Sequence, residues 1–188
     1  MELLIPGVAL WCGVHLVPTL GKGLKAALVE RIGTNPYRGL FTFAIVVSLA
    51  LIIVGWNNVD PVIAYEPPEW GIHANNALML LSMFLFVAAH LPTVARRVLR
   101  HPMLTGTAVW GIAHLLANGD QRSLTVFGAL TVWSIAEVLL INAREGEWVK
   151  ADAPGFTSEI IVLSVTAAAV AVVAFLHNLA GVPPFPFM

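Results

Sequence analysis

The sequence predicts an all-α membrane protein, a bundle of six transmembrane helices in a single domain over residues 1–188. Three observations predict it. The 188 residues are 58% hydrophobic and 11% charged, whereas soluble domains carry roughly 25% charged residues. The mean hydropathy is +0.82. Six nearly charge-free stretches, each near the length of about 20 residues that crosses the hydrocarbon core, follow one another along the chain.

The composition excludes several classes of function. The net charge is −1, from 10 Lys and Arg against 11 Asp and Glu, so the chain lacks a basic surface for nucleic acid. The single Cys12 cannot form an intramolecular disulfide, and a metal would depend on the six histidines. We expect the lipid bilayer and a lipophilic small molecule as partners, and a homo-oligomer stays open.

Ionic or turn-forming residues bound each expected span. Asn35-Pro36 opens the second, and Pro102 fits the first turn of the fourth, where a missing N–H costs nothing. Asn118-Gly119-Asp120 predicts the end of that fourth helix. The loops are short, so the protein acts within or beside the bilayer. The six spans are residues 3–20, 39–56, 74–91, 102–117, 123–142 and 160–180.

Basic residues predict the orientation of these spans. Nine of the ten lysines and arginines follow spans one, three and five, and Arg122 is the exception. Because cytoplasmic loops carry the excess of positive charge, both termini should face the periplasm. The nine residues are Lys22, Lys25, Arg31, Arg38, Arg96, Arg97, Arg100, Arg144 and Lys150.

Spans one and four share the pattern G-x-A-x-W-x-x-x-H-L, at residues 7–16 and 106–115. Tryptophan and histidine each occur only six times, so their recurrence at one spacing predicts two inverted three-helix halves. The second and fifth spans show no matching echo, and internal symmetry stays open.

The echo places His15 and His114 on oppositely directed helices, at depths that differ by roughly 10 Å. Two such imidazoles can bind a flat metallocofactor from its two faces. Trp11 and Trp110, four residues earlier, would supply flat apolar walls. Haem suits this composition best, because imidazole binds its iron axially and the porphyrin needs an apolar slot. Alternatively, each histidine only bonds a neighbouring helix, which is worth about 0.6 kcal/mol.

Glu137 is the one formal charge well inside an expected span, and it marks a functional site by default. It can accept a hydrogen bond from a ligating histidine, or it is protonated, or it extends toward Arg144. The remaining histidines are rival ligands at the two rims of the membrane. His90 and His101 lie at the cytoplasmic rim, and His73 and His177 at the other.

A possible anion site precedes the fourth span at Arg100-His101-Pro102, because free N–H groups at a helix start attract anions. Arg97 or Arg100 would neutralise a haem propionate there. A haem lying flat at mid-depth would have to tilt to reach them. The alternative is that these cations anchor the chain to lipid headgroups.

The tracts Arg100-His101-Pro102-Met103-Leu104-Thr105-Gly106 and Ala113-His114-Leu115-Leu116-Ala117-Asn118-Gly119-Asp120 resemble the NnrU family of integral membrane proteins, as does Asn35-Pro36-Tyr37-Arg38-Gly39-Leu40. The resemblance extends over essentially the whole chain. It implies a multi-pass protein of the bacterial inner membrane, associated with denitrification and nitric-oxide metabolism.

The NnrU family is similar to zeta-carotene isomerase, a membrane haem b enzyme that converts a cis double bond of a carotenoid to trans. That similarity implies His15 and His114 as the haem ligands. In the isomerase a cysteine stands three residues before the second ligand, where this chain has Gly111, while Cys12 precedes His15 by three. Redox-linked ligand exchange is therefore not carried over.

Three hypotheses follow. The first is a haem b protein with redox chemistry, or with isomerase chemistry on a lipid-soluble polyene. The second is a membrane methyltransferase that uses S-adenosylmethionine, because Arg100-His101-Pro102 also resembles its cofactor-binding tract and Arg144-Glu145-Gly146-Glu147 loosely resembles its second tract. The third is a non-catalytic assembly factor for nitric-oxide respiration.

Overall fold

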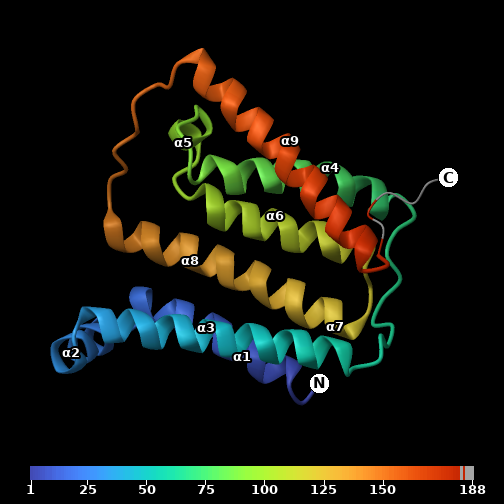
Figure 1. The fold of residues 1–188 in the computed structure, drawn as a ribbon, viewed down its shortest axis with the longest axis horizontal. Helices are drawn as coiled ribbons and strands as arrows, with labels where there is room; N and C mark the ends of the chain where they lie inside the picture. The colour runs from blue at the N-terminus through green and yellow to red at the C-terminus, as the bar shows by residue number, and fades with distance from the viewer. Residues whose placement is uncertain (183, 185–188) are drawn as a thin grey trace.

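A computed structural model describes residues 1–182 and 184, and the described part is helical with no strand. The expected all-α class is therefore confirmed (Figure 1). The elements are α1 (Leu4–Leu20), α2 (Lys22–Ile32), α3 (Thr34–Asn57), α4 (Gly71–Ala88), α5 (Ala95–Val98), α6 (Pro102–Ala117), α7 (Gln121–Ser123), the π-helical turn η1 (Leu124–Gly128), α8 (Ala129–Glu145) and α9 (Phe156–Leu179).

Each of the six expected spans coincides with a helix, but not every helix is long enough to cross a membrane. Four candidates are long and apolar enough, namely α3, α4, the rod 121–145 and α9. The pair α1 and α2 passes the test only as one span bent by 91°. With 16 residues, α6 extends about 24 Å, which is less than the hydrocarbon thickness of about 30 Å. A membrane protein is thus supported with four or five spans, and six remains a prediction.

Most of the basic residues gather at one end of the molecule. The start of α1 and the end of α9 lie at one end of the molecule (Figure 1). The links that carry nine of the ten basic residues lie at the other end. The start of α1 and the end of α9 therefore lie away from most of the basic residues, while the orientation of the termini toward the periplasm remains a prediction.

The sequence did not predict helix α2, because residues 21–38 fall between two expected spans. It turns away from α1 at Gly21 and buries none of its residues. Three cations, Lys22, Lys25 and Arg31, are distributed over its 11 residues. A helix of this composition suits the membrane surface, where its charges stay in water.

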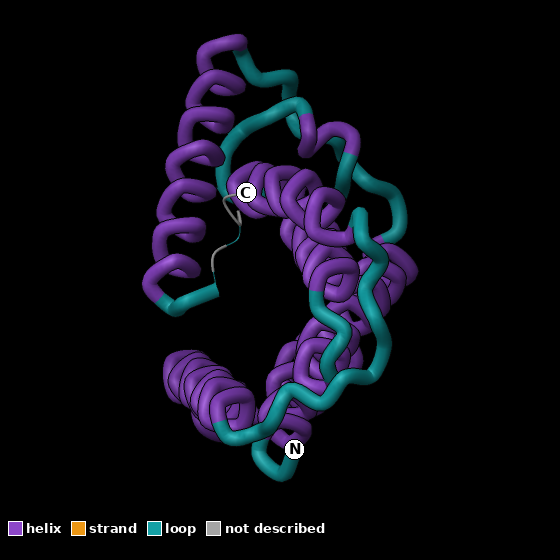
Figure 2. Tube along the Cα trace, turned by 90° about the vertical axis from the view of Figure 1, so that its right-hand side faces the viewer, coloured by secondary structure: helices purple, strands orange, loops and turns teal. Residues whose placement is uncertain are grey.

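The long helices form a curved row rather than a symmetric bundle. Neighbours in contact follow the order α3, α1, α8, α6, α4, α9, and Figure 2 shows most of them along their axes on a curve. Two inverted halves would pair α9 with α1 in the way that α4 pairs with α6. Among the described residues α9 makes no comparable contact with α1. The helix packing therefore repeats only in part, since α1 contacts α3 as α6 contacts α8, but the contact of α4 with α6 has no counterpart among the described residues.

Glycines allow the closest approaches between helices. A Cβ atom at Gly55 would lie 2.5 Å from the backbone nitrogen of Leu4, which sets the crossing of α1 and α3. A Cβ atom at Gly111 would overlap the Thr131 hydroxyl and lie 2.8 Å from the Phe127 carbonyl oxygen. Small residues at such contacts are typical of membrane helices, where packing rather than water drives association.

The junction between α6 and α7 is held by hydrogen bonds that the sequence did not reveal. The fourth helix ends at Ala117, as the Asn118-Gly119-Asp120 tract predicts. Asp120 also caps the next helix, since its Oδ1 accepts the N–H groups of Arg122 and Ser123 at 3.0 and 3.1 Å. Burial opposes ionisation of Asp120, but the bonds from Ser123 and Arg122 outweigh it and hold its pKa below the usual value. The Tyr65 hydroxyl donates to the carbonyls of Leu115 and Asn118 at the end of α6.

We expect Gly111→Ala to destabilise the protein by about 1–3 kcal/mol, because the new methyl group must push α6 away from α8. Unfolding of the purified protein in detergent, followed by helical circular dichroism, measures this. Gly13→Ala is the matched control, since a Cβ atom there meets nothing within 4 Å. Equal melting temperatures for the two variants would contradict the close contact.

Candidate functional site

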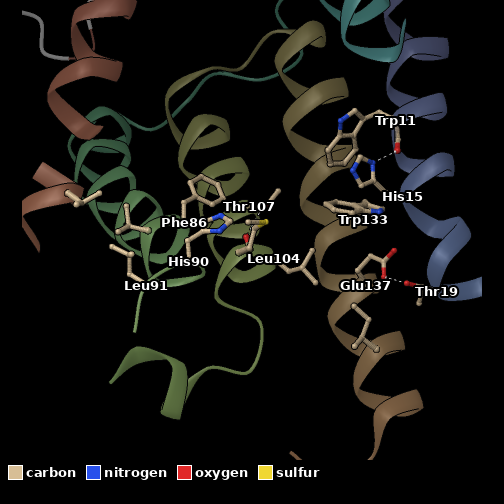
Figure 3. A pocket seen from close by; sticks show the side chains of 14 residues that line it. Trp11, His15, Thr19, Phe86, His90, Leu91, Leu104, Thr107, Trp133 and Glu137 are labelled. Atoms are coloured by element: carbon tan, nitrogen blue, oxygen red, sulfur yellow. Dashed lines mark hydrogen bonds between the residues drawn. The ribbon is translucent and has the colours of Figure 1, made fainter. Parts of the chain in front are cut away.

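Two cavities lie one after the other along the molecule. The larger has a volume of about 930 Å³ and is lined by α1 and α8 on one side and by α4 and α6 on the other (Figure 3). The smaller, of about 470 Å³, is lined by α4, α6, η1 and α9. Met79, Met83, Phe86 and His90 follow one face of α4 and its C-terminal extension and pass from the smaller cavity to the larger. The two cavities are therefore neighbours at different depths.

His15 lies on the α1 wall of the larger cavity within a group of aromatic rings. Its ring lies 3.9 Å from that of Trp11 and 5.3 Å from that of Trp133, between centroids. The His15 Nδ1 bonds the Trp11 carbonyl oxygen at 2.8 Å. Because a carbonyl only accepts, Nδ1 carries the proton and Nε2 keeps its lone pair. Nε2 is therefore the nitrogen available to a ligand.

Glu137 lies one turn along α8 from Trp133 and is 3% exposed. The Thr19 hydroxyl donates to its Oε2 at 2.6 Å. Its other oxygen, Oε1, and the Trp133 Nε1 are buried without a hydrogen-bond partner among the described residues. Burying such atoms unpaired costs about 1–3 kcal/mol each, so both are poised to bind a polar group of a ligand in this cavity.

His90 lies across the larger cavity from His15, beside Phe86 and Thr107 (Figure 3). The sequence placed it at a rim, and it is indeed exposed there. Its ring makes no hydrogen bond within residues 1–182 and 184. The larger cavity thus presents imidazoles on two facing walls.

His114 lines the smaller cavity instead, so the structure does not bring it into the cavity of His15. Its ring stacks on Phe127, with centroids 4.3 Å apart, and its Nδ1 bonds the Trp110 carbonyl oxygen at 2.9 Å. The two echoed histidines therefore share the same local geometry. Their aromatic partners Phe127 and Trp133 are six residues apart on one rod, about 9 Å along its axis.

Two side chains of the predicted anion site, those of Arg100 and His101, are paired with other parts of the chain. The Arg100 Nη1 donates to the Gly146 carbonyl at 2.7 Å, and its Nη2 lies 3.2 Å from the Glu145 carboxylate. His101 Nε2 pairs with the Asn142 side chain at 3.0 Å. Arg97 is exposed on α5, and none of the three expected residues lines either cavity. Arg100 and His101 thus tie the start of α6 to the end of α8.

The donor set fits a cofactor that brings most of its own ligands. In the described part of the chain, no group of three or more His, Cys, Asp and Glu side chains can hold a bare metal ion. A porphyrin supplies four nitrogens to its iron, so one or two imidazoles suffice. The volume of the larger cavity also lies within the usual range of roughly 300–1,000 Å³ for cofactor sites.

Cys12 and Gly111 bear on the comparison with zeta-carotene isomerase. Gly111 leaves no space for a cysteine side chain, because α8 fills that position. Cys12 packs against the apolar cluster around Leu4 and Phe127 and lines neither cavity. Neither position therefore provides a thiol at a cavity wall.

Fold and cavities together define a helical membrane protein with an apolar interior that bears histidines. The model of one family, described as NnrU protein, matches residues 3–184, and the chain belongs to the NnrU family. The family expected from the sequence is confirmed. Comparison with curated proteins and with solved structures gives no match.

The sequence did not identify Thr19 and Trp133 as site residues, and it indicated His90 only as an alternative haem ligand. One signal was present, since Trp133 and Glu137 are four residues apart, as are Trp11, His15 and Thr19 in sequence. That spacing places each set on one helix face. The sequence could not show that these two faces meet at one cavity.

We expect Glu137→Met to raise the melting temperature in detergent, because an apolar side chain of similar length removes an unpaired buried oxygen. Thr19 is then free to bond the carbonyl four residues earlier. Thermal unfolding of Glu137→Met and of a comparison variant, Thr19→Val, measures the effect. Thr19→Val removes the hydrogen bond to Oε2 of Glu137 and should be destabilising. A melting temperature of Glu137→Met below that of Thr19→Val would contradict the unpaired state of Oε1.

Proposed function

We propose that the protein is a membrane haem b protein whose larger cavity would hold the porphyrin, with His15 as a ligand of its iron. One observation carries the proposal: His15 keeps the Nε2 lone pair in an apolar cavity of about 930 Å³. The hydrogen bond that His15 Nδ1 donates to the Trp11 carbonyl oxygen orients the ring. It also increases the basicity of Nε2, as in other metal-binding histidines.

His90 is our choice for the second ligand, because it lines the same cavity on the facing wall. His114, favoured by the sequence echo and by the resemblance, lines the neighbouring cavity. For His114 to bind the same iron, the iron would have to lie at the boundary of the two cavities. The two assignments therefore predict different depths for the cofactor.

Other residues of the cavity would have separate roles. Trp11 and Trp133 provide flat apolar walls, and Glu137 with Thr19 provides a polar contact to the cofactor or to a bound molecule. A haem would supply one-electron redox chemistry, in nitrogen-oxide metabolism or toward a lipid-soluble polyene. Because no thiol lines the cavity, we propose haem binding without cysteine exchange. If the protein binds haem but converts no substrate, that result would support a role as a non-catalytic assembly factor.

We expect purified protein to show haem bands in a reduced-minus-oxidised spectrum. His15→Ala should lower haem content by about tenfold or more, a loss of at least roughly 1.4 kcal/mol of binding. His90→Ala should convert a six-coordinate spectrum to a five-coordinate one, while His114→Ala leaves it unchanged. His73→Ala is the control, since His73 is exposed and outside both cavities. A normal His90→Ala spectrum with an altered His114→Ala spectrum would reverse the assignment, and absent haem bands would end the proposal.

A membrane methyltransferase is the second candidate, favoured by one observation. The structure brings the Arg100-His101 tract against the tract that begins at Arg144, through the contacts of Arg100 with Glu145 and Gly146. Two sequence tracts that resemble the cofactor-binding parts of such enzymes are therefore adjacent. Here, however, their charged groups are paired with each other rather than facing a cavity.

Calorimetry with S-adenosylmethionine separates the candidates. We expect no binding heat, because Arg100 and Glu145 already satisfy each other. Heat from the wild type that is lost in Arg100→Ala but kept in His15→Ala would favour the methyltransferase.

A further inference from the structure

The smaller cavity brings together soft ligands from three helices. Met79 and Met83 lie one turn apart on α4, His114 lies on α6 and His177 lies on α9. Methionine thioethers and imidazoles are the neutral groups that bind soft metal ions. The sequence listed His177 only as a rival haem ligand and gave the two methionines no role.

Both histidines are oriented for ligation in the same way. The Nδ1 of His114 bonds the Trp110 carbonyl oxygen at 2.9 Å, and the Nδ1 of His177 bonds the Val173 carbonyl oxygen at 2.8 Å. Each carbonyl fixes the proton on Nδ1, so each Nε2 keeps a lone pair. Neither Nε2 has a hydrogen-bond partner in the described part of the chain.

An independent observation also indicates a bound group in this cavity. Asn75 lines it, is 9% exposed, and has its Oδ1 buried with no partner among the described residues. Its amide nitrogen instead donates to the Asn76 side chain at 3.3 Å. An unpaired carbonyl oxygen attracts positive charge and orients a cation or its bound water.

Charge decides which cation fits. Among the described residues no Asp, Glu, Lys or Arg lines the cavity, so the described lining leaves a bound ion its full charge in an apolar surrounding. The cost of removing an ion from water rises with the square of its charge, which penalises Zn²⁺ and Cu²⁺ far more than a monovalent ion. Thioether ligands further favour Cu(I).

We propose that the smaller cavity is a Cu(I) site, with Met79, Met83, His114 and His177 as its ligands and Asn75 beside it. The site lies in the cavity next to that of the proposed haem, and it rests on the assignment of His90, rather than His114, as the second haem ligand. A bound ion would link α9 to the α4 and α6 pair. It lies at the end of the molecule away from the basic links, at the C-terminal ends of α6 and α9.

The test uses the purified full chain in lipid nanodiscs, stripped of metal and titrated anaerobically with Cu(I) against a coloured Cu(I) chelator. We expect one Cu(I) per chain and X-ray absorption that shows both sulfur and nitrogen neighbours. Met79→Leu with Met83→Leu keeps side-chain volume and should remove the sulfur signal. Affinity should fall by about tenfold or more, equivalent to roughly 1.4 kcal/mol.

Controls separate this site from the haem site. Met103→Leu changes a methionine of the larger cavity and should leave Cu(I) affinity unchanged, and the Met79 and Met83 double variant should leave any haem spectrum unchanged. His177→Ala should weaken Cu(I) binding alone. The proposal is overturned by absent Cu(I) binding, by equal affinity in the double variant, by equally tight Zn²⁺ binding, or by loss of haem in His114→Ala.

Discussion

The close packing of α6 against α8 is the contact on which the rest of the arrangement depends. Gly111 leaves space for Thr131 and for the Phe127 carbonyl, so α8 lies directly between α6 and α1. Thr131 and Trp133 are two residues apart and point about 200° from each other around the helix. One face of α8 therefore contacts α6, while Trp133 and Glu137 reach the larger cavity.

The same backbone hydrogen bond orients three of the histidines. In His15, His114 and His177 the Nδ1 atom bonds the carbonyl four residues earlier. A helix thereby selects the tautomer with its own backbone and needs no second charged residue inside the membrane. This explains how the cavities present reactive nitrogens in a chain with so few buried ionic groups.

Much of the fold could be predicted from the sequence, because hydropathy and turn residues are local signals. The helical class, the membrane class and the family were confirmed. The sequence could not show which helix faces meet. The pairing of His15 with His114 assumed symmetric halves, whereas among the described residues α9 makes no contact with α1 like that between α4 and α6. The helix α2 was missed because its cations interrupt the apolar pattern.

The π-helical turn η1 has a consequence for the register of the whole rod 121–145. Such a turn contains one residue more than a regular helical turn, and each residue of a regular helix advances by about 100°. With the same residues in a regular α-helix, the capping residue Asp120 would therefore be rotated by about that angle relative to Trp133, whereas deletion of one residue of 124–128 would remove the extra residue and keep their present relation. In an ordinary α-helix, the cap and the aromatic wall of the larger cavity would not both face their present neighbours.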